Sequence, residues 1–415
     1  MAAPAWTGDP MSDVIDRVEV LVSSPTRNYV TLRITTRDGI VGLGDATVNG
    51  RELSVAAYLR DHVGPLLIGR DPGRIEDTWQ YLYRGVYWRR GPITMAAIGA
   101  VDIALWDILG KRTGQPLYQL FGGRVRDRLA TYRHAFGWDL PALLEQVDAH
   151  REAGFTNIRV QSGVPELDVV YGVTKAGPVY EPAGRTAAPA EEVWDVEAYL
   201  RYLPGVIAGV REHVGSGVGL LHDAHHRLTP IQAARLGKAL EEVAMFWLED
   251  VTPAEDQEAL RLVRQHTTTP LAIGEVFNTI WDCQYLIENR LIDYIRTAVV
   301  HAGGISHIRK IFALAEVHGV QAAPHGPSDV SPISLAASIH LGVATHNFAI
   351  QEYMGYPDLV HEAFPHAWSV ADGHLQPGDE PGLGVSLNDE LHSPDDYEPA
   401  YLPVARRRDG TLTDW

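Results

Sequence analysis

Three short apolar runs each end in an acidic residue: Val218-Gly-Leu-Leu-His-Asp223, Ala244-Met-Phe-Trp-Leu-Glu249 and Leu271-Ala-Ile-Gly-Glu275. The acids stand at equal intervals of 26 positions, at 223, 249 and 275. A strand, a helix and two loops occupy about that length in a repeating β/α architecture. The spacing predicts three neighbouring parallel strands that bring three carboxylates to one rim. Because such carboxylates repel one another unless a hard cation lies between them, the pattern favours a metal site over three unrelated acids.

The sequence around these runs is typical of a barrel. From about Arg128 strand patterns alternate with helical patterns, and the strands are expected to end near eight positions: His134, Gln161, Asp223, Glu249, Glu275, Val299, Pro324 and Gln351. Eight such strands predict an α/β fold with a (β/α)8 barrel. One connection, from Gly163 to about Pro189, is long and rich in Gly, Pro, Tyr and Ala, which is typical of a functional or mobile loop.

A different pattern precedes the barrel. Residues 14–53 alternate as antiparallel strands do, and residues 54–121 are helical in pattern. The helix around 95–109 is apolar on nearly every face, which predicts a buried helix between domains. We therefore divide the chain into a non-structural N-terminus (1–12), an α+β capping domain (13–125), the barrel domain (126–375) and a C-terminal segment that packs on the cap and the active site (376–415).

Composition narrows the class of protein. The chain has 415 residues, of which 45% are hydrophobic and 21% charged, as in soluble globular enzymes. Its net charge of −18 disfavours a nucleic-acid partner, since phosphate binding needs a basic face. We expect no membrane span, because no apolar stretch is predicted to reach the roughly 18 residues that one requires. We also expect no secretory signal, because residues 1–13 contain no basic region followed by an apolar core. The single cysteine, Cys283, excludes an internal disulfide, agrees with a cytoplasmic location and is expected to be a buried thiol.

Polar side chains follow each predicted barrel strand, where catalytic residues of such barrels lie. They are His134; Arg159 and Gln161; Asp223 and His225; Glu249; Glu275; Arg296 and His301; His325 and Asp329; and Glu352. A single histidine at a strand end is more often structural than catalytic, but several beside a metal site favour function. The rim suits a polyhydroxylated or carboxylated substrate.

Five motifs carry a family resemblance: Leu221-His-Asp-Ala-His-His-Arg-Leu-Thr-Pro230, Trp247-Leu-Glu-Asp250, Gly274-Glu-Val-Phe-Asn278, Val300-His-Ala-Gly-Gly304 and Gln351-Glu-Tyr353. With these motifs in this order, the sequence resembles the enolase superfamily and, within it, the mannonate dehydratase subgroup, over essentially the whole chain. The resemblance implies a modified (β/α)8 barrel with an N-terminal cap, and a homo-oligomer built from dimers, up to an octamer.

The resemblance also implies a cofactor. Asp223, Glu249 and Glu275 match the positions that hold one Mg²⁺ in this family. The ion would bind the substrate carboxylate and stabilise the enediolate that forms when the α-proton leaves.

The usual lysine base of the second strand is absent, and the sequence there is Arg159-Val-Gln161. In the mannonate dehydratase subgroup the matching arginine pairs with a tyrosine twelve residues later, where this chain has Tyr171. A phenol has a pKa near 10, and an adjacent guanidinium lowers that pKa, so the resemblance implies Tyr171 and Arg159 as the catalytic base. The alternative is that Tyr171 only packs in its loop and Arg159 binds a carboxylate.

His225 matches the general acid of the family, which protonates the departing 3-hydroxyl. It follows Asp223 by two residues, so we expect it on the same face of an extended segment, across the ion from the Arg159–Tyr171 pair. The family's substrate-binding set falls on Asn49, His134, Arg296, His325, Asp329, Glu352 and Trp415. Asn49 belongs to the cap, which would close over the barrel mouth and exclude water. His301 fits either a supporting role or proton shuttling.

The implied reaction removes water from D-mannonate, D-gluconate or both, and gives 2-keto-3-deoxy-D-gluconate. One stretch, Pro324-His-Gly-Pro-Ser-Asp329, departs from the Cys-His-Gly-Ala-Thr-Asp form of efficient mannonate dehydratases. Pro327 restricts the backbone beside His325 and Asp329, which favours a slow or dual-substrate enzyme. Two alternatives stay open: an enolase-superfamily epimerase or cycloisomerase, which would use bases on opposite faces, and a sugar-acid-binding or regulatory homologue with little or no catalysis.

Overall fold

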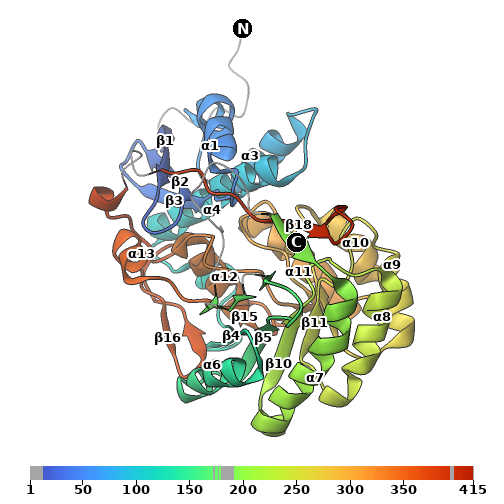
Figure 1. The fold of residues 1–415 in the computed structure, drawn as a ribbon. Coiled ribbons are helices and arrows are strands. Elements are labelled where there is room, and N and C mark those ends of the chain that lie inside the picture. The colour runs from blue at the N-terminus through green and yellow to red at the C-terminus, as the bar shows by residue number, and fades with distance from the viewer. Residues whose placement is uncertain (1–12, 172, 176, 179–190, 393–396, 415) are drawn as a thin grey trace.

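The structure is a computed structural model that describes residues 13–171, 173–175, 177–178, 191–392 and 397–414. Figure 1 shows two layers of structure: an N-terminal cap, in blue, lies above a ring of strands and helices formed by the rest of the chain. The chain thus has the fold class expected from the sequence, a barrel with an N-terminal α+β cap. The domain boundaries themselves stay a prediction.

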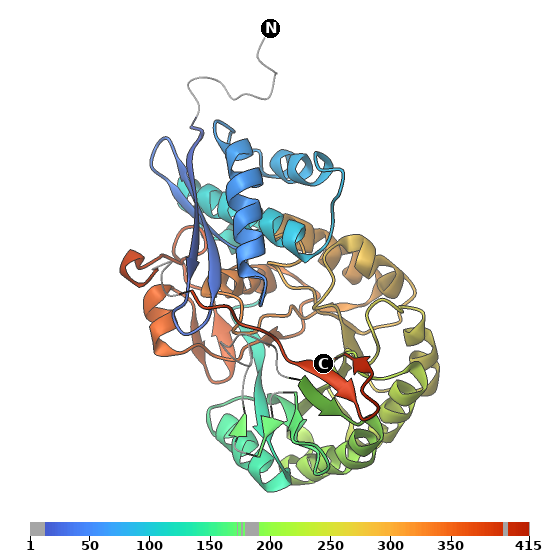
Figure 2. The ribbon, with the colours of Figure 1, turned by 45° about the horizontal axis from the view of Figure 1, so that its top comes forward.

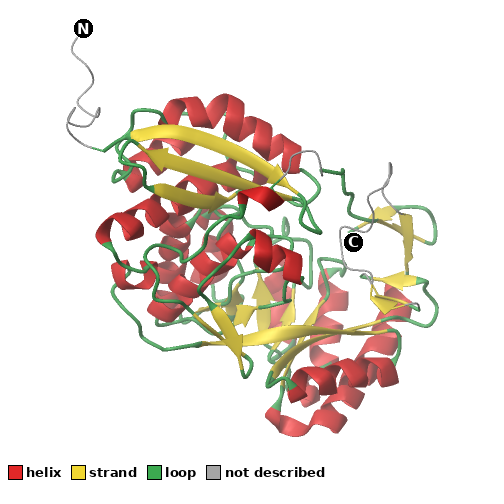
Figure 3. Cartoon of the chain, turned by 90° about the vertical axis from the view of Figure 1, so that its left-hand side faces the viewer, coloured by secondary structure: helices red, strands yellow, loops and turns green. Residues whose placement is uncertain are grey.

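The cap is a three-stranded antiparallel sheet packed on helices (Figure 3). Its strands, in sheet order, are β1 (Ile15–Ser23), β2 (Tyr29–Thr36) and β3 (Val41–Asp45). Its helical segments are α1 (Glu52–Tyr58), the π-helical turn η1 (Leu59–Val63), α2 (Gly64–Leu67), α3 (Ile75–Arg84), α4 (Pro92–Thr113) and α5 (Leu117–Leu120). The alternation read from the sequence is therefore confirmed as a strand pattern in this region.

Helix α4 is buried on almost every side, as its sequence predicts. It begins after Gly91 with Pro92 in the first turn, and it ends at Gly114, whose φ of 67° terminates the helix. By length and composition α4 is apolar enough to cross a membrane, so the expectation that no stretch reaches that limit is wrong. The helix instead packs against β3 and against the barrel, because an all-apolar helix in a large protein is a core element.

The contact between α4 and β3 leaves no room for a side chain at Gly44. An added Cβ there would overlap the carbonyl oxygen of Ala100, a backbone atom that cannot rotate away. We expect Gly44→Ala to lower the free energy of unfolding by about 2 kcal/mol or more, because overpacking forces the sheet and helix apart. Thermal unfolding checks this. Gly217→Ala, where a Cβ meets nothing within 4 Å, is the matched control; equal melting temperatures for the two variants would contradict the prediction.

The barrel contains the eight expected parallel strands. They are β4 (Leu129–Gly137), β5 (Asn157–Ser162), β10 (Gly219–Asp223), β11 (Trp247–Glu249), β12 (Leu271–Ile273), β13 (Tyr294–Ile295), β14 (Gln321–Ala322) and β15 (Gln351–Glu352). They follow one another around the sheet in chain order, and β15 pairs with β4. Between β14 and β15 an isolated parallel bridge joins Ala322 to Phe348. Three strands end earlier than predicted, β12 at Ile273, β13 at Ile295 and β14 at Ala322, because the chain leaves the ladder there and becomes rim loop.

Helices form an outer ring around these strands (Figure 2). They are α6 (Leu140–Glu152), α7 (Val196–Val214), α8 (Pro230–Ala239), α9 (Ala259–His266), α10 (Ile280–Glu288), α11 (Ile305–His318), α12 (Pro332–Ala344) and α13 (Asp358–Ala363), with 3-10 turns η2 (Gly215–Gly217), η3 (Glu241–Val243) and η4 (Asp389–Leu391). A separate cluster of buried apolar side chains includes Tyr132 of β4, Leu221 of β10 and Trp247 of β11. Cys283 is buried in α10, as expected.

The long connection after β5 carries more structure than its composition predicts. Three two-residue strands, β6 (Val169–Val170), β7 (Val173–Thr174) and β8 (Gly177–Pro178), form a small antiparallel sheet. The next strand, β9 (Glu191–Trp194), pairs with β18 (Val404–Arg407), which pairs with β19 (Leu412–Thr413). The C-terminal segment therefore lies beside the loop that carries Tyr171.

The C-terminal segment also contacts the base of the barrel and the cap. The hairpin of β16 (Ser369–Ala371) and β17 (His374–Gln376) adds antiparallel to β4. Beyond it, Asp389 forms an ion pair with Arg33 of β2, with Oδ1 and Nη1 2.8 Å apart. The side chain of Asn28 donates a 2.7 Å hydrogen bond to the carbonyl of Glu398. This segment thus ties the two parts of the molecule together.

Candidate active site

The three equally spaced acids meet at one end of the barrel. Asp223 is the last residue of β10 and Glu249 the last of β11, and the parallel register places the two side by side. Glu275 follows the end of β12 by two residues. One carboxylate oxygen from each acid lies within 4.8 Å of the others. Asp223 and Glu249 are buried, and the side chain of Glu275 is 11% exposed.

These carboxylates suit a small divalent ion. Asp223 Oδ2 is buried and accepts no hydrogen bond from the residues that the structure describes. Burial raises the pKa of Glu249 well above its ordinary value, although the buried guanidinium of Arg296 opposes that rise. Burial acts in the same sense on Glu275, but His325 and His225 hold the pKa of its carboxyl well below the usual range. Three carboxylate oxygen donors of this kind are the ligands that Mg²⁺ prefers.

Arg159 lies against both Asp223 and Tyr171, the pairing that the family resemblance implies. Its Nη2 atom is 3.3 Å from Asp223 Oδ2, and its Cζ atom is 5.1 Å from the centre of the Tyr171 ring. Arg227 lies over the same ring, with its Cζ atom 5.5 Å from the ring centre. Burial opposes the charge on Arg159, but Tyr171, Asp223 and Glu249 together raise the pKa of its guanidinium well above the ordinary value. Two cations therefore border the Tyr171 phenol, and cations favour the phenolate form.

His225 does not continue an extended segment, so that prediction is wrong. The chain turns after Asp223, with φ of 53° at His225 and 62° at His226. The turn is held by the backbone N–H of His225, which donates a 2.7 Å hydrogen bond to Asp223 Oδ1. The turn directs His225 toward Tyr171, with ring centres 4.4 Å apart, and places its Nε2 3.5 Å from Glu275 Oε1. Base and acid candidates are thus neighbours, and the expectation that they face each other across the ion is wrong.

A second buried group of charges lies against the acids. Arg296 contacts Glu249 through Nε and lies 2.9 Å from Glu352 Oε2 through Nη2. His134 Nε2 is 2.8 Å from Glu352 Oε1, and burial together with Arg159 lowers the pKa of His134 to about 4. His325 Nε2 lies 3.5 Å from Glu275 Oε2. The structure thus brings together four of the predicted substrate-binding residues, and two of the buried ones, Arg296 and His134, are already paired with carboxylates.

The cap reaches the site through Asn49. Its side-chain amide donates a 3.1 Å hydrogen bond to Asp329 Oδ2, in the loop after β14. His301 Nε2 lies 2.9 Å from the carbonyl oxygen of Thr47, so this nitrogen carries the proton and the ring bridges barrel and cap. Gln161 donates to the carbonyl of Asp223 at 3.2 Å. Trp415, predicted to bind substrate, lies outside the described residues.

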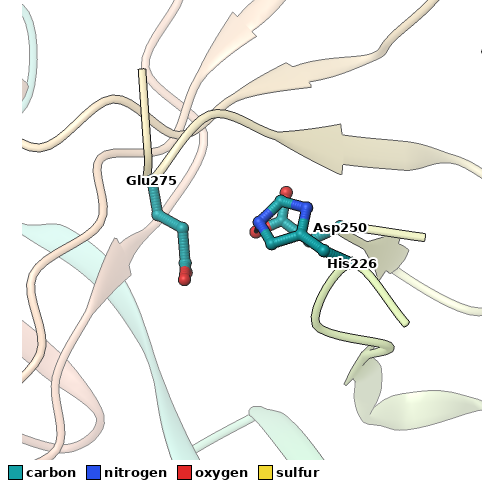
Figure 4. Close-up of side chains that lie close together, drawn as sticks. All are labelled: His226, Asp250 and Glu275. Carbon is teal, nitrogen blue, oxygen red and sulfur yellow. Dashed lines mark ion pairs between the residues drawn. The ribbon is translucent and has the colours of Figure 1, made fainter. Parts of the chain in front are cut away.

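Two residues beside the acids were not singled out from the sequence. His226 Nε2 lies 3.3 Å from Asp250 Oδ2 (Figure 4), and both have left-handed backbones, with φ of 62° and 42°. Burial lowers the pKa of His226, but Asp250 and Glu275 outweigh it and raise that pKa to about 9; burial raises the pKa of Asp250 to about 8. Their place in the sequence could have pointed to them, because His226 directly follows His225 and Asp250 directly follows Glu249.

Comparison with known proteins agrees with this geometry. Residues 17–122 match the mandelate racemase / muconate lactonizing enzyme N-terminal domain, and residues 142–391 match the enolase C-terminal domain-like family. A D-galactonate dehydratase family member of Streptomyces bingchenggensis is 69% identical over 404 residues, which cover 97% of this chain and 98% of that protein. A D-mannonate dehydratase of Rhizorhabdus wittichii is 54% identical, over 97% of this chain and 100% of its own length.

Among solved structures, an enolase from Pantoea ananatis with bound D-gluconate and Mg is similar throughout. It superposes with a TM-score of 0.90 at 37% sequence identity, and the match covers 97% of this chain and 100% of that one. The resemblance noted in the sequence is confirmed, and the chain belongs to the enolase superfamily.

Proposed function

We propose that this protein is a Mg²⁺-dependent aldonate dehydratase that removes water from D-mannonate, D-gluconate or both to give 2-keto-3-deoxy-D-gluconate. The observation that carries the proposal is the convergence of Asp223, Glu249 and Glu275 at one barrel rim, with Tyr171 and His225 in contact beside them. At the coarser level, the chain is a hydro-lyase of the sugar-acid dehydratase kind, given its dehydratase relatives. The choice of sugar acid is the part we propose.

A Mg²⁺ ion held by the three acids would neutralise the charge that develops on the substrate carboxylate when its α-proton leaves. The chain's own groups do the rest. Tyr171, bordered by Arg159 and Arg227, accepts the α-proton. His225 donates a proton to the 3-hydroxyl as it departs. Because the two rings lie side by side, both groups reach the same face of the sugar acid, which favours syn elimination.

The remaining polar groups orient the substrate in this proposal. His134, Arg296, His325 and Glu352 line the barrel side. Asn49 and Asp329 close the cap side through their mutual hydrogen bond. Because the cap covers the rim, it would exclude water from the developing charge. Trp415 is also proposed to bind substrate, and this role rests on the family resemblance alone. A cytoplasmic homo-oligomer likewise stays a prediction.

The proposal is tested by assaying the purified chain with Mg²⁺ against a panel of aldonates for 2-keto-3-deoxy product. We expect product from D-mannonate, D-gluconate or both. A chain that binds aldonates without turnover would instead support the sugar-acid-binding alternative. Exchange at the α-carbon with inversion and no loss of water would support an epimerase. Absence of product from every aldonate would overturn the proposal.

Substrate preference is expected to depend on Pro327. This residue is buried in the loop that carries His325 and Asp329, and the neighbouring N–H of Gly326 donates a 3.0 Å hydrogen bond to Glu352 Oε2. Pro327→Ala frees the backbone, and shifts of under an ångström at these groups change rates strongly. We expect the mannonate-to-gluconate ratio of kcat/KM to rise roughly tenfold.

The control for Pro327 is Pro381→Ala, in a loop of the C-terminal segment beside Lys111. Steady-state kinetics on both aldonates measures the two ratios. A ratio that is the same in Pro327→Ala, Pro381→Ala and the wild type would show that Pro327 does not set the preference.

A further inference from the structure

Asp45 is a buried carboxylate of the cap that the proposed mechanism does not use. It is the last residue of β3, its exposed fraction is 0%, and it forms no ion pair with the residues that the structure describes. Because burying a carboxylate without a cation is costly, its hydrogen bonds must compensate. Oδ1 accepts from the backbone N–H of Thr47 at 2.9 Å and from its hydroxyl at 2.7 Å, and Oδ2 accepts from the backbone N–H of Ser331 at 2.6 Å.

The hydrogen bond from Ser331 joins the barrel to the cap. Ser331 directly precedes α12, and β3 packs against that helix, above it in Figure 1. Asp45 Oδ2 therefore lies at the N-terminus of a helix of 13 residues, where the helix dipole favours a negative charge. Because the donor is a backbone N–H, this bond determines where the loop before α12 lies relative to β3.

On the cap side, Asp45 holds the turn that precedes Asn49. The two bonds from Thr47 close a tight turn after β3, of the kind that aspartate side chains stabilise. The carbonyl of Thr47 also accepts a 2.9 Å hydrogen bond from His301 Nε2 of the barrel. Asn49 follows two residues later and donates to Asp329 Oδ2 at 3.1 Å. The position of Asn49 thus depends on a turn that Asp45 anchors.

The barrel loop that contains Asp329 is held on both sides of that residue. The hydroxyl of Tyr29, a fully buried residue of β2, donates a 2.9 Å hydrogen bond to the carbonyl of Ser328. Asp45 holds Ser331, two residues beyond Asp329. One carboxylate is therefore connected to both members of the Asn49–Asp329 pair, to the first through its own turn and to the second through Ser331.

We propose that Asp45 is a positioning residue for sugar-acid binding, which holds Asn49 and Asp329 at their contact distance and so keeps the cap in place over the barrel mouth. The role rests on the proposed function, because Asn49 and Asp329 belong to the proposed substrate-binding set. Asp45 itself is fully buried, so it acts through these two residues and not by touching the substrate.

The test replaces Asp45 with asparagine, which keeps the shape of the side chain. An amide has one acceptor oxygen, so its NH2 group must face the N–H of either Thr47 or Ser331, and one attachment is lost. We expect Asp45→Asn to raise both Kd and KM for D-gluconate or D-mannonate about tenfold. The kcat should stay within about twofold, because the groups that move protons are unchanged. Calorimetry on the Mg²⁺-loaded chain measures Kd, and steady-state kinetics measures KM and kcat.

A double-mutant cycle shows whether Asp45 acts through the Asn49–Asp329 contact. Asn49→Ala removes that contact and should weaken aldonate binding by itself. Adding Asp45→Asn to it should weaken binding by about threefold at most, because the contact that Asp45 maintains is already gone. A further loss of the full tenfold would show that the two residues act independently and would overturn the proposal.

Asp107→Asn is the matched control. Asp107 of α4 is another fully buried carboxylate of the cap, and it accepts the N–H of Leu43 at 3.0 Å and that of Leu383 at 2.9 Å. It has no hydrogen bond to residues 328–331 in the part of the chain that the structure describes. We expect this variant to melt at a lower temperature with Kd and KM unchanged.

Hydrogen–deuterium exchange without aldonate gives a readout that needs neither binding nor turnover. Peptides that contain residues 45–49 and 328–331 should exchange faster in Asp45→Asn than in the wild type or in Asp107→Asn. Peptides from the outer helices should keep wild-type rates, which shows that the variant is folded.

The outcomes separate this role from the proposed reaction. Equal Kd, KM and exchange in Asp45→Asn and the wild type would overturn the positioning role and leave the dehydratase standing. A fall in kcat at unchanged KM would also overturn it. Raised Kd and faster exchange, in a chain that binds aldonates without dehydrating them, would support the positioning role and overturn only the proposed reaction.

Discussion

Replacing Tyr171 with phenylalanine is expected to lower kcat for aldonate dehydration by about 10³-fold or more, because it removes the hydroxyl of the proposed base. The ring contacts with Arg159 and His225 stay possible without the hydroxyl. Binding of Mg²⁺ should be unchanged, because the phenol is not one of the three carboxylate ligands. Product formation, and exchange of the substrate α-proton with deuterium from solvent, are the two measurements.

The exchange measurement separates the roles of the two rings. His225→Asn should lose dehydration but retain exchange of the α-proton, since Tyr171 can still remove it. Tyr171→Phe should lose both. Tyr202→Phe, on the outer helix α7, is the control and should keep wild-type rates. Near-normal turnover by Tyr171→Phe would remove this residue as the base and leave the alternative that it only packs in its loop.

Removal of the metal is the second large effect. Treatment with a chelator should reduce activity to less than about one thousandth, and added Mg²⁺ should restore it, because the buried cations Arg159 and Arg296 are already paired with carboxylates and cannot replace the charge of the ion. Mg²⁺ should also stabilise the folded chain, by about 2.7 kcal/mol at a concentration of 100 times Kd. Relief of repulsion among Asp223, Glu249 and Glu275 is the physical reason.

Glu249→Gln should abolish both the activity and the Mg²⁺-dependent rise in melting temperature. Arg296 loses one partner in this variant but keeps Glu352 at 2.9 Å, so the variant is compared with its own metal-free melting temperature. Glu316→Gln removes a surface carboxylate that lies 3.5 Å from His346, and it should behave as wild type. Full activity of the chelator-treated chain would contradict the metal assignment.

The barrel and its acid rim were predictable from local sequence. Parallel strands place successive C-terminal ends at one edge, so the equal spacing of Asp223, Glu249 and Glu275 was enough to predict that they meet. Helix α4 was likewise recognised as buried from its apolar faces. The strand boundaries near Val299 and Pro324 were less accurate, because a rim loop and a short strand have the same composition.

The sequence by itself determined the fold and the three acids, because both depend on spacing along one chain, and the family resemblance implied the pairing of Arg159 with Tyr171. The tertiary structure alone decided which groups face one another. The left-handed turn after Asp223 moves His225 against Tyr171, and the same turn brings His226 to Asp250. Those contacts depend on backbone angles at residues that rarely adopt φ above zero, and they are stabilised only when three separate strand-end loops are packed together.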